Sequence, residues 1–565
     1  MRTDLHFYAA VTRSLATLFS EDEPDMGTRE IKFDYIVVGA GSAGCVLAAR
    51  LSEDANVRVL LLEAGPPDTS PWIHLPIGYG RTMWDKRVNW CFETEPEPNM
   101  LGRKIYWPRG KTLGGSSSIN GLIYIRGQRE DYDDWARAAN TDWSFDACLP
   151  YFKRSERNQR GASPYHGGDG PVGVSDIGAK HELIEAFIAG AEENGVPRTE
   201  DFNGEQQVGA GYYQLTTWKG LRCSTAKGYL TSVAKARSNL RIETNALATR
   251  VLFEGKRAVG VEYLQNGVKI QARASAEVLL AAGAIQSPQL LQLSGVGESG
   301  LLQQFGIPVV QHAPQVGQNL QDHLQIRLSY ECTKPITTND QLNSIVGKVK
   351  MGMEWFFKRS GPLAVGINQG GCFLATSAAP DKNRPDIQYH VATLSADMAG
   401  GKVHNYSGFT LSVCQLRPES RGYLAITSAN PTVPPAMHAN YLATDLDRRT
   451  VVAAVRSARA IAQSKAMSPY VKREVKPGPD LQTDDEILHF CRQVGATIFH
   501  PSGTCRMGVD AEAVVNPRLR VNGVEGLRVI DCSIMPTLVS GNTNAPIIMV
   551  AEKAVEMILE DAKRT

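Results

Sequence analysis

The fold is decided by residues 35–65, YIVVGAGSAGCVLAARLSEDANVRVLLLEAG. The apolar run Tyr35–Val38 predicts a buried strand, and Gly39, Gly41 and Gly44 follow it in GxGxxG spacing. Apolar residues then recur at helical intervals, so the segment predicts a strand, a tight turn and a helix. Such a turn needs glycine because the backbone bends sharply, approaches a pyrophosphate closely and packs its helix against the sheet. The amides that begin the helix would face the phosphates.

A second strand and an acidic residue complete this motif. Val57–Leu62 is apolar, and Glu63 follows it about 20 residues beyond the last glycine, where dinucleotide-binding folds place the acceptor for a ribose hydroxyl. The segment therefore predicts a site for an ADP-containing dinucleotide; a glycine-rich turn with a surface glutamate is the alternative. The motif alone does not distinguish NAD from FAD.

The composition is that of an ordinary globular protein. The 565 residues are too many for one hydrophobic core, so two or more packed domains are expected. A formal net charge of +1 gives no electrostatic footprint for nucleic acid, so the expected partners are small molecules. The ten cysteines lack CxxC or Cys/His ligand spacing, which predicts neither a disulfide framework nor a metal site. No apolar run reaches the roughly 18 residues that span a bilayer, and no signal-peptide core is evident, so a cytoplasmic protein is expected.

Residues 1–32 precede the nucleotide motif and form a candidate amphipathic arm. Five apolar residues recur there at helical spacing: Leu5, Tyr8, Val11, Leu15 and Leu18. Packing against the body of the protein is the simpler interpretation of this stripe. An interfacial contact with a membrane, peripheral at the inner membrane, is the other interpretation.

A second glycine-rich stretch, WPRGKTLGGSSSINGLIYIRG, occupies residues 107–127. Its glycines and small hydroxyls, Gly114, Gly115 and Ser116 to Ser118, allow backbone amides to crowd against a flat polar ring or a phosphate. A plain serine-rich turn is the alternative interpretation.

Five stretches together resemble the signatures of the glucose–methanol–choline (GMC) oxidoreductases. They are Gly110–Asp133 (GKTLGGSSSINGLIYIRGQREDYD), Gly283–Gly297 (GAIQSPQLLQLSGVG), Val316–His323 (VGQNLQDH), His500–Gly508 (HPSGTCRMG) and Gly541–Ala554 (GNTNAPIIMVAEKA). The resemblance runs from about residue 33 to the end of the chain, and within the family the sequence is similar to bacterial choline-dehydrogenase-like alcohol dehydrogenases. It implies FAD as the cofactor, which resolves the ambiguity left by the glycines.

The resemblance also implies an α/β fold with two interleaved domains. Residues 33–150, 221–322 and 491–565 are expected to form a Rossmann-like FAD-binding domain, the last of them with the catalytic residues. Residues 151–220 and 323–490 are expected to form a substrate domain built on an antiparallel sheet. The strand-like runs DIQYHVATL and GFTLSVCQL, both in the second of these segments, agree with such a sheet.

The motifs and the resemblance nominate a set of cofactor-binding residues. These are Gly39, Gly41, Ser42, Ala43, Gly44, Glu63, Ala64, Gly110, Leu113, Gly115, Ser116, Asn120, Gly121, Ile123, Val251, Asp531, Asn542 and Pro546. By the resemblance, Val251 would present its backbone to the adenine. Some members of the family attach FAD covalently through a histidine in the GGSSS-like stretch; the corresponding residue here is Ile119, so non-covalent FAD is expected.

The chemistry that the family performs identifies a candidate base. Oxidation of an alcohol by a flavin requires an acceptor for the hydroxyl proton and one for the hydride, and flavin N5 serves as the second. Histidine suits the first task because its neutral imidazole is available near neutral pH. Among eleven histidines, His500 stands out because it ends the apolar run ATIF, precedes Pro501 and occupies the family's catalytic position. His323 and His489 are the alternatives.

The second expected catalytic residue is Asn544, in GNTNAP. Its amide can donate a hydrogen bond to the substrate oxygen and stays neutral throughout. By the resemblance it aligns with the family's second catalytic position, which is His or Asn, and the nearby Asn542 can be confused with it. Capping of the helix predicted for Pro546–Ile558 is the alternative role for both asparagines.

The sequence therefore predicts an FAD-dependent dehydrogenase that oxidises a primary alcohol to an aldehyde and passes electrons to a quinone, a dye or a similar acceptor. An oxidase that uses O₂ is the alternative within this class, and a flavin-containing lyase of the same fold is the rival from another class. Light-driven fatty-acid decarboxylation is disfavoured, because relatives of that kind lack the catalytic histidine.

Overall fold

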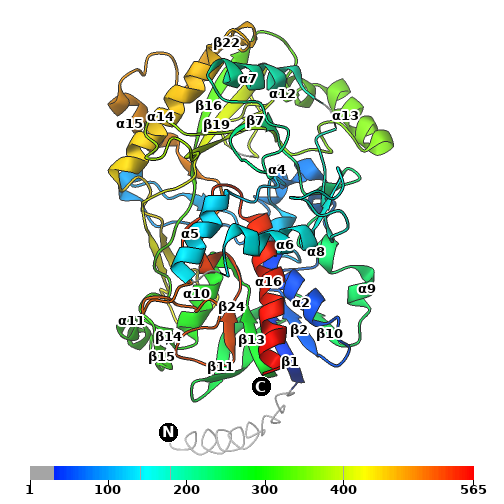
Figure 1. Ribbon diagram of the computed structural model, residues 1–565, viewed down its shortest axis with the longest axis vertical. Coiled ribbons are helices and arrows are strands. Elements are labelled where there is room, and N and C mark those ends of the chain that lie inside the picture. Colours follow the sequence, from blue (N-terminus) through cyan, green and yellow to red (C-terminus); the bar gives the residue numbers. More distant parts are fainter. Residues whose placement is uncertain (1–30, 140–141, 179, 399, 565) are drawn as a thin grey trace, which may run out of the picture.

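The computed structural model describes residues 31–564 apart from 140–141, 179 and 399. Of the predicted arm, residues 1–30 lie outside the described residues, and 31–32 already belong to the first strand. The described chain forms two lobes stacked along its long axis (Figure 1). The helices are α2 (Ser42–Leu51), α3 (Pro71–His74), α4 (Tyr79–Thr82), α5 (Arg129–Ala139), α6 (Phe145–Ser155), α7 (Glu182–Glu193), α8 (Thr225–Tyr229), α9 (Ser232–Lys235), α10 (Gly283–Leu293), α11 (Ser299–Gln304), α12 (Thr338–Leu342), α13 (Ile345–Lys358), α14 (Asp445–Ala462), α15 (Asp484–Val494) and α16 (Asn544–Ala562).

The lower lobe in Figure 1 is built on a seven-stranded sheet with the order β10-β2-β1-β13-β12-β11, and β24 pairs with β13. Its strands are β1 (Ile31–Val38), β2 (Val59–Leu62), β10 (Leu240–Glu243), β11 (Ala246–Glu254), β12 (Arg257–Gln265), β13 (Val268–Leu280) and β24 (Leu527–Val529). β1 pairs parallel with both β2 and β13. β10 also pairs parallel with β2, and β24 with β13. β12, in contrast, pairs antiparallel with both β11 and β13. Parallel strands covered on both faces read as continuous apolar runs, which explains the predicted strand at Tyr35–Val38. The Rossmann-like sheet is confirmed.

Helices on this sheet tie the two ends of the chain together. The last helix, α16, packs against α2 and α6. Its fully buried Glu552 accepts hydrogen bonds from Arg50 of α2 (Nη2–Oε1, 2.9 Å), from Arg154 of α6 (Nε–Oε2, 2.9 Å) and from the Tyr229 hydroxyl of α8 (2.6 Å). A buried carboxylate is stable only when it is paired, so this anchor requires all three elements to be in place.

The upper lobe contains a second seven-stranded sheet, which is antiparallel throughout. Its order is β22-β16-β19-β18-β17-β7, with β23 beside β16. Its strands are β7 (Gly209–Tyr212), β16 (Leu324–Cys332), β17 (Asn368–Leu374), β18 (Ile387–Ala392), β19 (Gly408–Gln415), β22 (Val471–Lys476) and β23 (Ala496–Thr497). Helices α7 and α14 contact this sheet, and α14 packs on α7 and α15. The predicted antiparallel sheet is confirmed, and segments of the chain alternate between the two sheets.

Short strands complete the structure outside the two sheets. They are β3 (Phe92–Glu93), β4 (Tyr106–Trp107), β5 (Glu156–Asn158), β6 (Val172–Val174), β8 (Thr217–Trp218), β9 (Leu221–Arg222), β14 (Val296–Gly297), β15 (Gln311–His312), β20 (Tyr423–Ala425) and β21 (Ala436–His438). Each lobe has its own large apolar core, one centred on β1, α2 and α16 and the other on β16, β19 and α14.

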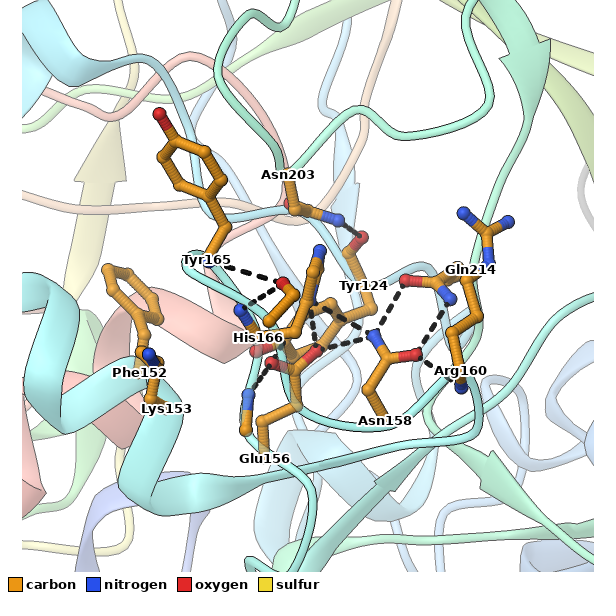
Figure 2. Close-up of polar contacts among 12 residues, drawn as sticks. Tyr124, Phe152, Lys153, Glu156, Asn158, Arg160, Tyr165, His166, Asn203 and Gln214 are labelled. Carbon is orange, nitrogen blue, oxygen red and sulfur yellow. Dashed lines mark hydrogen bonds and ion pairs between the residues drawn. The ribbon is translucent and has the colours of Figure 1, made fainter.

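A buried network of charged groups lies where α6 passes into β5 (Figure 2). Glu156, fully buried, accepts from Arg126 (Nη2–Oε2, 2.6 Å) and contacts Nδ1 of His166 (2.9 Å), whose Nε2 lies 2.8 Å from Asp201 Oδ2. Asn158 also donates to Glu156 (2.9 Å). Burial alone lowers the pKa of His166, but its hydrogen bonds to Asp201 and Glu156 raise that pKa to about 9. The imidazole therefore carries a proton on each nitrogen and is held as a cation between two carboxylates.

Candidate active site

Two cavities adjoin each other, and the second takes residues from both lobes. The first, which we call the glycine-loop cavity, has a volume of about 360 Å³ and is lined by the turn at Gly39 and Gly41. The second, the histidine cavity, has a volume of about 670 Å³ and includes His500 in its wall. Five residues line both cavities: Ser42, Arg109, Ser116, Cys532 and Ile547. An extended molecule can therefore occupy the first cavity and present one end to the second.

Three glycines at this turn, Gly39, Gly44 and Gly115, have no room for a side chain. A Cβ atom on Gly44 would lie 1.8 Å from the carbonyl oxygen of Gly39, and one on Gly115 would lie 2.6 Å from Cα of Gly41. Gly39 has a φ of +96°, which disfavours other residues. Gly41 is the N-cap of α2 and provides no side-chain cap, so the first amides of that helix are available to a ligand in the cavity. The geometry fits a pyrophosphate at a helix N-terminus.

Glu63 lies at the same cavity, as expected for a residue that binds ribose. Its carboxylate accepts from the backbone N–H of Ala40 (3.1 Å) and of Gly65 (2.8 Å). Burial raises the pKa of Glu63 to about 7, although the two amide hydrogen bonds act in the opposite direction. Each carboxylate oxygen keeps a further lone pair for a ribose hydroxyl.

The structure does not place Val251 at this cavity. Its backbone N–H instead donates to Ser294 Oγ (2.8 Å), and the part of β11 that lines the cavity is Ala246, Leu247 and Ala248. The register of β11 against β12 shifts between Ala248 and Arg250. The residues of β11 at this cavity are therefore Ala246 to Ala248, which precede the irregularity, and not Val251 as expected.

The remaining predicted cofactor residues divide between the cavities. Those that line the glycine-loop cavity are Gly39, Gly41, Ser42, Ala43, Glu63, Ala64, Gly110, Gly115, Ser116 and Asp531. Those that line the histidine cavity are Ser42, Ser116, Asn120, Gly121, Ile123 and Asn542. Gly44, Leu113 and Pro546 line neither cavity: Gly44 packs against Gly39, and Leu113 and Pro546 are buried.

The chain brings His500 to the cavity through a short strand. β23 pairs antiparallel with the start of β16, and His500 follows β23 after Phe499, whose φ of +74° lies in the left-handed region. Two contacts hold this uncommon conformation: Phe499 N–H donates to Thr497 Oγ1 (2.7 Å), and its carbonyl accepts from Arg109 Nη1 (2.7 Å). The His500 N–H then donates to Asp322 Oδ1 (2.8 Å). A strained residue beside a candidate base is typical of active sites, where the surroundings over-determine the backbone.

The hydrogen bonds around His500 specify which of its nitrogens carries the proton. His323 Nε2 lies 2.9 Å from the carbonyl oxygen of Leu416, which can only accept, so His323 carries its proton on Nε2. Its Nδ1 is then an acceptor, and it lies 3.0 Å from Nδ1 of His500. His500 therefore donates through Nδ1 and keeps an unprotonated Nε2. Burial lowers the pKa of His323 to about 4. Burial is also the main reason why the pKa of His500 lies well below 6.5, and the nearby His323, His390 and Arg109 lower it further.

Asn542, and not Asn544, is the asparagine that faces His500. Asn542 Nδ2 lies 3.4 Å from His500 Nε2, and Gln388 Nε2 donates to Asn542 Oδ1 (3.2 Å), which fixes the orientation of the amide. Asn544 instead accepts at Oδ1 from the hydroxyl of Ser42 (2.7 Å). The reason is positional, because Asn542 lies in the turn before α16, whereas Asn544 is the first residue of the helix and is rotated toward α2. The N-cap of α16 is Thr543 and no side chain caps it, so neither asparagine has the capping role.

Two neighbours of His500 were not assigned their roles from the sequence: Arg109 was not singled out, and His323 was considered only as an alternative base. Arg109 lines both cavities and donates to Ser116 Oγ through Nη2 (2.8 Å). It lies within the WPRGK stretch, so its position in the motif was the available signal. His323 was an alternative base; it is the partner of His500. His489, the other alternative, is exposed on α15 and lies 3.0 Å from Gln493 Nε2.

The wall of the histidine cavity has an uneven charge. Among the described residues that line it there is no aspartate or glutamate, whereas Arg81, Arg109 and Arg327 are present. Arg327 donates from Nε to Gln325 Oε1 (3.2 Å), and Gln325 Nε2 in turn lies 3.3 Å from His390 Nδ1. Burial lowers the pKa of the Arg327 guanidinium. No group of acids, histidines and cysteines that could hold a metal ion occurs in the described part of the chain.

Comparisons with known proteins agree with this geometry. Two family models, both described as GMC oxidoreductase, match residues 33–325 and 418–551. The chain is 46% identical to the mitochondrial choline dehydrogenase of Mus musculus over 536 residues, which cover 93% of this chain and 89% of that protein. It is 45% identical to an alcohol dehydrogenase (acceptor) of Pseudomonas putida over 530 residues, 93% of this chain and 96% of that protein. The crystal structure of pyridoxine 4-oxidase from Mesorbium loti matches with a TM-score of 0.84 and 30% identity, over 93% of this chain and 98% of that one.

Proposed function

This chain belongs to the GMC oxidoreductase family, and from that membership we propose that it uses FAD to oxidise a primary alcohol to an aldehyde, with electrons passed to an acceptor other than NAD. One observation carries the proposal: the unprotonated Nε2 of His500 lies in the wall of a cavity that adjoins the dinucleotide site. A substrate hydroxyl in that cavity would meet a base that is already neutral.

The glycine-loop cavity suits FAD as the dinucleotide. Gly39, Gly41 and the first amides of α2 would hold the pyrophosphate, and Glu63 would hold a ribose. When bound, FAD would supply the hydride acceptor at the border with the histidine cavity. Ile119, a buried residue that lines the histidine cavity, has no group that could form a bond to the cofactor, so we propose that FAD is dissociable. Precipitation with acid should leave the yellow colour in the supernatant; a coloured pellet would contradict this.

Side chains of the protein would remove the hydroxyl proton and hold the substrate oxygen. His500 would take the hydroxyl proton at Nε2 while its Nδ1–H stays bonded to His323. Asn542 would donate from Nδ2 to the substrate oxygen as negative charge develops on it. Gln388 holds the Asn542 amide in the orientation that this requires. His323 acts through His500, because its own tautomer sets which nitrogen of His500 is free.

The arginines in the wall of the histidine cavity affect which alcohols can bind there. Choline would bring a fixed positive charge to a wall with Arg327 and without a described acidic residue, so we propose that the substrate is neutral or carries an acid group remote from its hydroxyl. Gln325 and Arg327 alternate along β16 on the same face as His323, about 7 and 13 Å of strand from it.

Anaerobic reduction of the flavin tests the proposal directly. Each of 1-hexanol, 6-hydroxyhexanoate and choline is mixed with the holoenzyme, and the loss of flavin absorbance is followed. We expect the first two to bleach the flavin and choline to be the slowest. His500→Ala should slow bleaching by roughly 10²-fold or more. A spectrum unchanged by any alcohol would exclude the function, and choline as the fastest substrate would exclude only the inference about charge.

A second candidate is an oxidase that passes electrons to O₂. The observation that favours it is the similarity to a structure named as an oxidase. Peroxide released per alcohol oxidised in air, compared with reduction of a quinone or dye, distinguishes the two functions. Turnover without any change of flavin colour would instead indicate a lyase.

A further inference from the structure

The outer face of α13 is apolar, which is unusual for a surface helix. Six large apolar side chains on this helix are each 52–80% exposed: Ile345, Val346, Val349, Met353, Phe356 and Phe357. No other helix or strand in the described part of the chain has more than one exposed large apolar residue. Figure 1 shows α13 at the outer edge of the upper lobe.

Helical geometry places these six side chains on one stripe. At about 100° per residue they fall within an arc of about 120°. The opposite side of the helix contacts the protein: Met351 is buried, and the Trp355 indole N–H donates to the carbonyl of Gly220 (3.1 Å). An ordinary surface helix turns its apolar stripe toward the core. Here the apolar stripe is turned to the outside.

Two lysines lie beside the stripe. At about 100° per residue, Lys348 and Lys350 fall beyond its two edges, and both are exposed. Lys358 lies on the far side of the helix, and the Arg359 guanidinium stacks on the Trp355 ring, 4.0 Å from its centroid. Glu354 is the one acid between residues 345 and 359, and it accepts a hydrogen bond from Ser360 Oγ (3.3 Å). An apolar stripe with lysines beside it complements the acyl boundary and the anionic headgroups of a bilayer. A protein partner would be expected to match the stripe with a shaped apolar surface, and would not require this excess of positive charge.

The segments before and after α13 line the histidine cavity. Thr338 and Leu342 of α12, which precedes α13, line that cavity, and so does Pro362, which follows it. Trp72, Trp84 and Met398 also line the cavity and are exposed. A surface that docked through α13 would therefore lie close to the route by which molecules reach His500.

We propose that α13 is a membrane-docking helix, which lies in the headgroup region of an anionic bilayer with Phe356 and Phe357 inserted at the acyl boundary. No helix in the described residues is long and apolar enough to cross a bilayer, so attachment through α13 is peripheral. Given the proposed function, this attachment brings the cavity to a lipid phase from which an apolar alcohol or a quinone can enter. The docking itself does not depend on that function.

Vesicle co-sedimentation of the full-length holoenzyme tests the docking. We expect the parent to bind vesicles of phosphatidylcholine with 30 mol% phosphatidylglycerol, to bind pure phosphatidylcholine less well, and to lose affinity as salt rises. The double variant Phe356→Glu/Phe357→Glu should bind at least tenfold more weakly. The matched control Val233→Glu/Val268→Glu changes two exposed apolar residues on other elements and should bind as the parent does. Retained flavin and unchanged rates with a soluble dye show that each variant is folded.

Three results would overturn the proposal. The first is a parent that does not sediment with anionic vesicles. The second is a double variant that binds as tightly as the parent, in particular if removal of residues 1–30 abolishes binding, because attachment would then belong to that segment. The third is a parent that dimerises in solution through α13, shown by a dimer in sedimentation velocity that the double variant dissociates while vesicle binding is unchanged.

Discussion

The charged histidine of the buried network gives a stability prediction whose size follows from the structure. His166 has a pKa of about 9 in the folded protein against 6.5 for an ordinary histidine. The folded state therefore binds this proton more tightly than the unfolded state does, so the stabilisation is fully present below pH 6.5 and is lost as the pH rises through 9. At about 1.4 kcal/mol per pH unit the loss is about 3 kcal/mol. For a chain of 565 residues this corresponds to a fall of roughly 3 °C in Tm.

The assay compares the parent with His166→Gln. Tm is measured by tryptophan fluorescence at half-unit steps from pH 6 to pH 10. Gln can donate a hydrogen bond but has no charge to lose, so the difference in Tm between the two proteins should be largest near pH 6 and should shrink by roughly 3 °C toward pH 10. His489→Gln, at an exposed histidine, is the matched control and should follow the parent at every pH. A difference between the parent and His166→Gln that does not change with pH would refute the reasoning, because the imidazole would then not be held as a cation.

Three further predictions concern the active site. Asn542→Ala should lower the rate of flavin reduction by roughly 10²-fold, because the substrate oxygen loses one hydrogen-bond donor. Asn544→Ala should change this rate by less than about tenfold. If stopped-flow measurements give the reverse order, Asn544 is the donor to the substrate. His323→Phe removes the acceptor that fixes the tautomer of His500, so kcat should fall by about tenfold or more with little change in KM, and a parallel rise in KM would indicate a disturbed cavity instead. Gly44→Ala places a methyl group 1.8 Å from the Gly39 carbonyl oxygen, so the purified variant should contain little FAD, measured as the ratio of absorbance at 450 to 280 nm; full flavin content would show that the turn can open.

The parts of the site that a sequence can specify are those where the backbone itself is constrained. Gly39, Gly44 and Gly115 are recognisable because only glycine tolerates such close packing, and that requirement is visible in the residue type. The apolar runs of the parallel strands were recognisable because both faces are buried. His500 was identified by its family position, and its cavity agrees with that role.

The parts that could not be predicted depend on rotation and on distant pairing. Asn542 and Asn544 differ only in whether they precede or begin a helix, and a sequence does not show which of them turns toward His500. Which residues of β11 line the cavity depends on where the strand meets it, and the sequence alone did not show that these are Ala246 to Ala248 rather than Val251. The partner of His500, His323, is 177 residues away in the chain, so only the fold reveals the tautomer. Helix α13 reads as an ordinary amphipathic helix, because the pattern does not say which side faces the protein.

The anchor that Glu552 provides has a consequence for biosynthesis. Arg50 and Arg154 are synthesised 502 and 398 residues before the carboxylate of α16 that pairs them. Asn542 and Ile547, which line the histidine cavity, are made equally late relative to the glycine turn. A nascent chain without α16 therefore lacks both this buried anchor and part of the cavity wall.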